Sequence, residues 1–507
     1  MDPAATRIED GAATRNKGLR PNAVGFMGVL AESVSEITPS AAVALLVPLV
    51  AVSAGNGSWL SWVICTAILW CVAFCCSQIL KHRSVTGGLI GLVDTTGFRT
   101  ATLGVAGCVL AFALWANPGN IVGVALLFQN WFNAIGVGSS PWLVFGISVV
   151  AILLGSGLAA QDIALSAAAL LAIELVTLSL IAILMLIVLI DHHHGSFFDT
   201  SQLTMRGVSF HGLLLGVVAA GFAAVSFECS ATLGAETKDA HKALPRSLYA
   251  SVLGTGLIFV IASYVMTLGF AGVRGGMAAS TDPLGDLARM YGVNWMRYLI
   301  LFGVALGYFG AVVAFVNWSC RVLYTLASDG LLPRFLAKVN RRTRTPTRAI
   351  WVLAVLALAY NAALGLSGQA NLVVWGYVAT AGACMYFMAY LIALAAFGFR
   401  GWRQPRRVVV AVVSVLGIAG LGLEVFKSVS PTPPYPLSLW TWVGVGTGAI
   451  ALGGAIMLRR TGVRLPPTIG QGTTVDTIAE GVDAGGPDLG AGAAHGSTVE
   501  HLLISEQ

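Results

Sequence analysis

Twelve apolar stretches follow one another along most of the chain, and each is long enough to cross a bilayer as an α-helix. A helix needs roughly 20 apolar residues to span a hydrocarbon core of about 30 Å. The stretches therefore predict an all-α polytopic membrane protein with twelve transmembrane helices. They are Val24–Val52, Trp59–Leu80, Ala101–Phe132, Trp142–Ala160, Ile163–Ile190, Gly212–Gly234, Ser247–Phe270, Met296–Leu326, Thr347–Leu366, Leu372–Phe397, Val408–Val425 and Leu439–Leu458.

Composition indicates the same class and narrows the chemistry. Apolar residues make up 56% of the 507 residues and charged residues 10%, and the mean hydropathy is +0.81, as in proteins that live in a bilayer. All eight cysteines lie inside apolar stretches, which is typical of small buried residues and not of a disulfide framework or a zinc site. The first twenty residues are polar, so we expect no cleaved signal peptide.

Positive charge is strongly asymmetric across the twelve-span arrangement. Loops and tails on one side carry 24 of the 29 Lys and Arg residues. Because positively charged loops stay in the cytoplasm, this asymmetry places both termini inside the plasma membrane. The five basic residues on the outer side are Arg206, Arg274, Arg289, Arg297 and Lys427.

The first stretch, Val24–Val52, is too long for one straight helix. Its 29 residues would extend about 43 Å as a continuous helix, against a hydrocarbon core of about 30 Å. Thr38 and Pro39 stand in its middle, and a residue before proline is disfavoured in the helical region. Pro39 suits the first position of a new half-helix capped by Thr38. We therefore predict a break at Thr38.

The sixth stretch carries polar groups at mid-membrane depth. Ser226, Glu228, Ser230 and Thr232 follow an apolar run that begins near Gly212. A charged group at that depth is costly and usually faces a cavity or a partner. Irregular backbone at that depth is tolerated only where it lines a protein cavity. We predict a second break here; the alternative is that the hydroxyls only bond back to nearby carbonyls.

The two predicted breaks occupy the same place in two successive blocks of five spans, an arrangement that points to a transporter's binding site. Because five is odd, the two blocks have opposite orientations and form an inverted repeat. The predicted segments are an N-terminal tail (1–23), the first repeat (24–190), an outer loop (191–211), the second repeat (212–397), two further helices (398–458) and a disordered tail (459–507).

Two segments resemble the signatures of a known superfamily. The sixth-span sequence SFECSATLGAETKDAHKALPR resembles that of the amino acid–polyamine–organocation (APC) superfamily, and so does the span-8 segment from Asn317 through Pro333 to Pro346. The resemblance covers roughly residues 24–458 and implies a LeuT-type fold, in a variant with proline in the first span. The chain departs from the usual pattern at Ala235, where the family has a first acid, and at Asp239-Ala240, where it has Asn-Pro.

The breaks supply groups that would bind an amino acid. Free backbone N–H groups at the start of the second half-helix would hold a carboxylate, and freed carbonyls near Val225, Ser226 and Phe227 would take an ammonium. Phe222 matches the family's aromatic gate, or else is a core residue. The predicted substrate-binding residues are Thr38, Ser40, Ala41, Ala42, Asn117, Ser226, Phe227, Glu228 and Ala231.

Four residues are candidates for ion coupling. Glu32 and Glu36 share a helix face, and either carries a proton, contacts a cationic substrate or simply reaches water. For Glu174 in span 5 the same alternatives apply. Ser319 is either a sodium ligand or a packing residue. Asn117 belongs to a polar group, residues 117–120, that is expected to interrupt span 3 and line the site or pack between helices.

The sequence therefore predicts a secondary active transporter of an amino acid or related amine, working by alternating access as a proton-coupled symporter. The alternatives are an amino acid/amine exchanger and a membrane sensor on the same fold. An enzyme is not expected, because only His211 lies near the interior of the spans and the run His192–His194 is read as a solvated loop. The expected partners are the bilayer and a small substrate, with no nucleic acid, no metal and no cofactor beyond a coupling proton or sodium ion.

Overall fold

The computed structural model describes residues 22–138, 140–161, 163–191, 199–223, 225–280, 282–340, 342–367, 371–400, 407–430, 435–461 and 466–470. Most of the expected N-terminal tail, the histidine run 192–194 and the tail beyond residue 470 lie outside the described residues.

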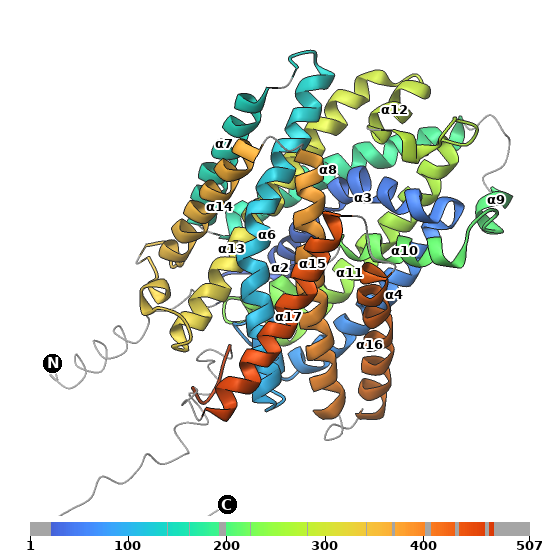
Figure 1. The fold of residues 1–507 in the computed structure, drawn as a ribbon. Helices are drawn as coiled ribbons and strands as arrows, with labels where there is room; N and C mark the ends of the chain where they lie inside the picture. The colour runs from blue at the N-terminus through green and yellow to red at the C-terminus, as the bar shows by residue number, and fades with distance from the viewer. Residues whose placement is uncertain are drawn as a thin grey trace, which may run out of the picture. The chain divides into compact units, whose positions relative to one another are not determined.

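Every predicted span corresponds to helical structure (Figure 1). Ten segments are apolar and long enough to cross a membrane, and the first of them, Phe26–Leu80, contains two predicted spans. The fold class is therefore confirmed. In order, the spans are α2 (Phe26–Ile37) with α3 (Pro39–Ala54), α4 (Ser58–Leu80), α6 (Arg99–Ala134), α7 (Pro141–Ala159), α8 (Ile163–Ile190), α10 (Phe210–Gly221) with η2 (Phe227–Leu233), α11 (Ala240–Gly269), α13 (Asn294–Ser328), α14 (Thr347–Ser367), α15 (Asn371–Arg400), α16 (Arg407–Val429) and α17 (Leu437–Arg460).

Short helices occupy the connections between the spans. They are η1 (Gly55–Gly57), α5 (Leu89–Asp94), α9 (Thr200–Leu203), η3 (Met277–Ala279), α12 (Pro283–Met290) and η4 (Arg334–Ala337).

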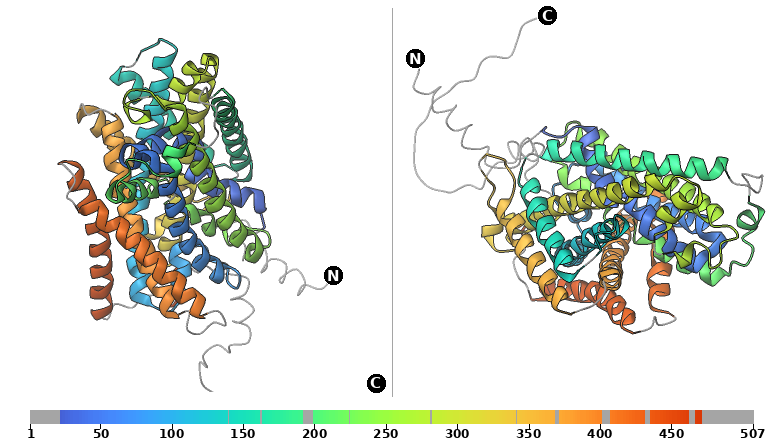
Figure 2. Two further views of the ribbon diagram at one scale, coloured as in Figure 1. Left: turned by 90° about the vertical axis from the view of Figure 1, so that its right-hand side faces the viewer. Right: turned by 90° about the horizontal axis from the view of Figure 1, so that it is seen from above.

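The long helix α6 lies at the centre of the bundle and packs along α13 and α15, as Figure 1 shows. The two C-terminal helices, α16 and α17, lie against α15 at the edge opposite to α8 (Figure 2, right). Pro118 lies inside α6, which continues through it. The prediction that residues 117–120 interrupt span 3 is therefore wrong.

The first break is a turn through a single residue. Thr38 has φ 45° and ψ 69°, a left-handed conformation that ends α2, and Pro39 is the first residue of α3. Proline fits there because it has no N–H to leave unpaired. The sequence predicted that the Thr38 side chain caps α3, and this prediction is wrong. The Thr38 hydroxyl instead donates to the Ser35 carbonyl at 2.8 Å.

The second break is longer and resumes differently. Helix α10 ends at Gly221, and the chain turns at Ser226, which has φ 62° and ψ 17°. It then continues as the 3₁₀ helix η2 instead of an α-helix. The predicted break is confirmed, and its continuation has three residues per turn instead of 3.6.

The two broken spans lie side by side. The Ser33 hydroxyl donates to the Ser230 hydroxyl at 2.8 Å. Closer to the loop after η2, the Val24 N–H donates to the Glu236 carbonyl at 2.9 Å, and the Lys238 N–H donates to the Val24 carbonyl at 2.8 Å. Contacts along both segments therefore bring the breaks together.

A C-terminal strap, Pro466–Gly470, packs against α5. The Gly87 N–H donates to the Gly470 carbonyl at 2.8 Å, and the Gly470 N–H donates to the Asp329 carboxylate at 2.7 Å. Ile469 is fully buried, and a Cβ at Gly91 would meet the Gly470 oxygen at 2.3 Å, so the approach requires glycine. Burial raises the pKa of Asp329, and the hydrogen bond from the Gly470 N–H opposes this rise.

The predicted disordered tail from residue 459 is therefore wrong where the structure describes it. Arg459 and Arg460 continue α17, and the strap has defined partners. Hydrogen bonds between the strap backbone and Gly87, Asp94 and Asp329 hold the strap in place. The Pro- and Gly-rich composition of the strap gives no sign of these partners.

Candidate functional site

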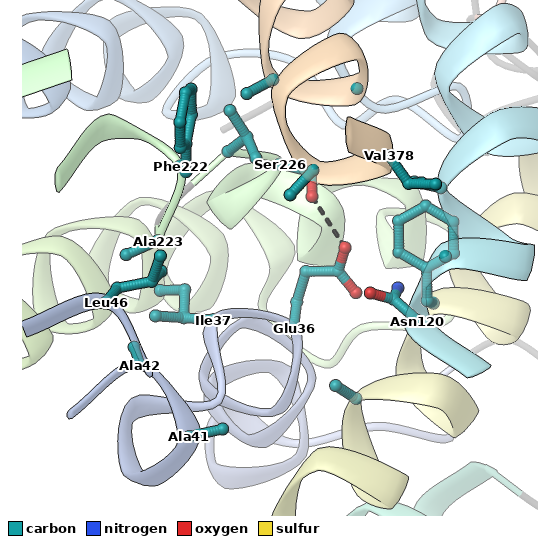
Figure 3. A pocket seen from close by; sticks show the side chains of 18 of the residues that line it. Glu36, Ile37, Ala41, Ala42, Leu46, Asn120, Phe222, Ala223, Ser226 and Val378 are labelled. Atoms are coloured by element: carbon teal, nitrogen blue, oxygen red, sulfur yellow. Dashed lines mark hydrogen bonds between the residues drawn. The ribbon is translucent and has the colours of Figure 1, made fainter. Parts of the chain in front are cut away.

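A cavity of about 100 Å³ lies between the two breaks and the central helices (Figure 3). By the same measure, one water needs only about 10–15 Å³, so the cavity has room for a small solute. Its wall comes from α2, α3, the α10–η2 break, α6, α13 and α15. The lining residues are Glu36, Ile37, Ala41, Ala42, Leu45, Leu46, Phe112, Ala116, Gly119, Asn120, Phe222, Ala223, Val225, Ser226, Tyr308, Ala311, Phe315, Trp375, Val378, Ala379, Gly382 and Ala383.

Among the described residues that line this wall, Glu36 is the one with a charged side chain. It lies in the last turn of α2, and one carboxylate oxygen accepts a hydrogen bond from the Ser226 hydroxyl at 2.7 Å (Figure 3). The other oxygen is buried and has no hydrogen-bond partner among the described residues. A buried acceptor without a partner is costly, so this oxygen marks where a donor on a ligand would bind.

Asn120 presents a second acceptor to the cavity. The Trp375 indole N–H donates to the Tyr308 hydroxyl at 3.0 Å, and that hydroxyl donates to the Asn120 side-chain oxygen at 3.3 Å. The relay joins α15, α13 and α6 and holds the amide in place. In Figure 3, Glu36 and Asn120 direct oxygens toward the same part of the cavity.

The rest of the wall is apolar and rich in aromatic rings. Phe112 contacts Phe315 edge-on, with ring centroids 5.4 Å apart. Phe222, the predicted gate, lines the cavity and stacks on Phe387 at 6.4 Å. Its position agrees with the expectation, and its movement as a gate stays a prediction.

The start of α3 is already occupied by a carboxylate of the chain itself. Glu174 on α8 accepts from the Ser40 N–H at 2.7 Å and from the Ser40 hydroxyl at 2.9 Å. The Ala42 N–H donates to the Thr38 carbonyl at 3.0 Å. The prediction of free N–H groups is therefore wrong for Ser40 and Ala42, because a residue of span 5, distant in sequence, supplies the cap.

Glu228 does not line the cavity. It is buried, and its two carboxylate oxygens accept hydrogen bonds from the hydroxyls of Tyr386 and Tyr390 on α15. The Tyr390 hydroxyl also accepts from the Ser226 N–H at 3.1 Å. Glu228 therefore braces the second break against α15.

One of the carbonyls predicted to be free at the second break already has a partner. The Ser226 carbonyl accepts from the Cys229 N–H at 2.8 Å, so the prediction that it is free for an ammonium group is wrong. Val225 remains in the cavity wall.

The nine predicted substrate-binding residues divide into two groups. Ala41, Ala42 and Ser226 line the cavity, and their substrate-binding role stays a prediction. The remaining residues are buried outside the lining: Thr38, Ser40, Asn117, Phe227, Glu228 and Ala231.

Two of the predicted coupling residues are buried away from the cavity. Glu32 is 4% exposed and lies near Arg321, so in this structure it does not reach water. Ser319 is fully buried on α13, and its hydroxyl has no partner among the described residues.

A buried ion pair joins the two segments that carried the resemblance. Arg321 on α13 donates to Glu236, just after η2, at 3.0 Å and 3.4 Å. Both side chains are at most 5% exposed. Because water does not solvate either buried charge, separating the pair would cost free energy.

Sequence reasoning missed Tyr308 and Trp375 as parts of the site, and it proposed Asn120 only as a member of the polar group at 117–120. Asn120 lines the cavity, whereas Asn117, the member of that group predicted to bind substrate, is buried outside the lining. Tyr308 and Trp375 had no comparable signal, because one aromatic residue in an apolar span resembles any other.

The sequence profile of the amino acid permease family matches residues 25–456. The chain belongs to this family. The match extends from the start of the first span almost to the end of the last, so the APC superfamily assignment holds for the whole bundle.

Individual relatives are distant and differ in their named substrates. An uncharacterised transporter of Mycobacterium tuberculosis is 24% identical over 335 residues, 63% of this chain and 69% of the relative. The branched-chain amino acid permease of Bacillus subtilis is 27% identical over 171 residues, 33% of this chain and 35% of that protein. The methylthioribose transporter of the same organism is 24% identical over 170 residues, 33% and 36% of the two chains.

The protein is thus a multi-pass membrane transporter of a small molecule and not an enzyme.

Proposed function

We propose that the protein moves an amino acid or a related amine across the plasma membrane by alternating access, as a proton-coupled symporter. The observation that carries the proposal is the cavity between the two breaks, with an unpaired carboxylate oxygen of Glu36 in its wall. An ionisable group at this depth is a candidate functional site. The asymmetry of the basic loops supports a cytoplasmic location for both termini.

We further propose an inverted repeat of LeuT type, in which spans 1, 2, 6 and 7 rock against spans 3, 4, 5, 8, 9 and 10. Buried contacts cross between these groups, among them the bonds from Tyr386 and Tyr390 on α15 to Glu228 in η2. Ser40 on α3 bonds to Glu174 on α8, and Glu236 after η2 pairs with Arg321 on α13. Rocking would have to separate at least one of them, so each is a candidate for a contact that differs between the inward- and outward-facing states.

For coupling, we propose a proton carried by one of the buried acids Glu32, Glu36 or Glu174. Their placement in the broken span and against its second half supports this, because a proton gained or lost there changes the charge beside the breaks. A sodium ion near Ser319 is the second candidate, favoured by its buried, unpartnered hydroxyl.

Uptake of radiolabelled amino acids and amines into proteoliposomes tests the proposal. Accumulation that collapses with a protonophore and does not require sodium is the expected result. Accumulation that requires a sodium gradient would identify sodium, and not the proton, as the coupling ion.

The rivals give different results in the same assay. Uptake that occurs only when the vesicles hold internal substrate would identify an exchanger. Binding without any flux, in vesicles whose protein is folded and correctly inserted, would identify a sensor and contradict transport.

A further inference from the structure

The cavity has an acidic side chain and no basic one. Among the described residues that line it, Glu36 is the charged residue, and none is Lys, Arg or His. A ligand cation would be paired by Glu36, with Asn120 as a second acceptor. A ligand carboxylate would find no cationic side chain in this wall and would lie in the same small space as the Glu36 charge, which is unfavourable.

Glu174 occupies the Ser40 donors at the start of α3, where a carboxylate would otherwise bind. Both the N–H and the hydroxyl of Ser40 donate to it, at 2.7 Å and 2.9 Å, and its side chain is 2% exposed. Gly307 on α13 makes room for it, because a Cβ there would meet a Glu174 oxygen at 2.5 Å. A second carboxylate at the same half-helix start would face this one at close range.

The remaining wall suits the body of an amine. Phe112, Phe222, Phe315 and Trp375 present aromatic surface, which attracts both apolar groups and cations. A primary ammonium has three N–H donors, and the unpaired Glu36 oxygen and the Asn120 oxygen are two acceptors for them.

We propose that the site selects primary amines that lack a carboxylate, of the alkylamine or arylalkylamine class, and that Glu174 stands where the carboxylate of an amino acid would otherwise bind. The inference rests on the proposed function and narrows its substrate class. It also argues against exchange of an amine for its parent amino acid, because an exchanger must bind both.

A matched series of compounds tests the selectivity on the wild-type protein. Leucine, leucinamide and 3-methylbutylamine share a side chain and an amino group, and only leucine carries a carboxylate. Phenylalanine, phenylalaninamide and 2-phenylethylamine form a second series. Binding is measured by thermal-shift titration of the purified protein, and uptake by proteoliposomes, with protein-free vesicles to subtract passive entry of the amines.

The expected result is that the amine and the amide of at least one series bind about tenfold tighter or more than the acid, a difference of about 1.4 kcal/mol. Acid binding as tight as amine binding would overturn the inference and, if the acid is taken up, would leave the proposed function intact. If the folded, inserted protein takes up no member of either series and no other amino acid or amine, both the inference and the proposed function are overturned.

Variants of Glu174 test the reason for the selectivity. Glu174→Ala frees the Ser40 N–H and should narrow the amine-to-acid ratio by improving binding of the acid, whereas Glu174→Gln keeps an acceptor oxygen for Ser40 and should narrow it less. Retained amine binding shows that each variant is folded. A ratio unchanged in Glu174→Ala, with amine binding retained, would overturn the role given to Glu174.

Discussion

The first break turns at one residue and resumes as an α-helix, whereas the sixth turns at Ser226 and resumes as a 3₁₀ helix. Each break has an acid nearby, and the two acids have opposite surroundings. Glu36 faces the cavity with one oxygen unpaired. Glu228 has both oxygens bonded to tyrosine hydroxyls and faces away from it.

The difference separates a ligand-binding acid from a structural one. A carboxylate whose oxygens all accept hydrogen bonds from the protein is stabilised little by a further donor on a substrate. A buried carboxylate with an unpaired oxygen is stabilised much more by such a donor. Hydrogen-bond satisfaction, and not mere depth in the membrane, therefore supports the substrate role that we propose for Glu36 and distinguishes it from the bracing role of Glu228.

The largest expected effect is that of Glu36→Gln on substrate affinity. The change keeps the shape of the side chain but removes the charge that pairs with an ammonium. A hydrogen bond to a charged group is worth about 1.5–3 kcal/mol, so amine affinity should fall about 10- to 100-fold. Thermal-shift titration measures it, and size-exclusion chromatography checks folding. Affinity unchanged in a folded variant would remove Glu36 from the site.

Glu228→Gln should show the opposite pattern. A glutamine has one oxygen acceptor, so one tyrosine hydroxyl loses its carboxylate partner, at a cost of about 1–3 kcal/mol in a buried site. We expect lower thermal stability and a lower maximal uptake rate, with apparent affinity nearly unchanged. The uptake rate and the apparent affinity are measured separately in proteoliposomes. A large loss of affinity with normal stability would reverse the roles of the two acids.

Ser226→Ala is expected to have the smallest effect. It removes the 2.7 Å hydrogen bond that orients Glu36, worth about 1 kcal/mol, so amine affinity should fall severalfold. Ser230→Ala is the matched control, because Ser230 bonds to Ser33 and is not part of the cavity wall. Equal losses of affinity in the two variants would show that the Ser226 effect is a general loosening of the break.

The sequence predicted the breaks because their causes are local. Proline after Thr38 and a cluster of polar groups around Ser226 each act on the few residues beside them. The sequence did not predict which acid faces the cavity. A 3₁₀ helix turns its side chains to different faces than an α-helix does, and Glu228 finds its partners on α15, about 160 residues away in the chain.

The cap on α3 and the C-terminal strap were missed for the same reason. Glu174 reaches Ser40 from span 5, and the strap meets Gly87 and Asp329 from the far end of the chain. Neither pairing has a local sequence signal, so single-sequence reasoning could propose the participants but not their partners.

An experimental structure of the protein with 3-methylbutylamine bound tests the central claim most directly. The account predicts the amine nitrogen in the cavity between the breaks, about 2.7–2.9 Å from a Glu36 carboxylate oxygen, with Glu174 still bonded to Ser40. An amine nitrogen bonded to Glu228, or seated outside the cavity with Glu36 unoccupied, would contradict it.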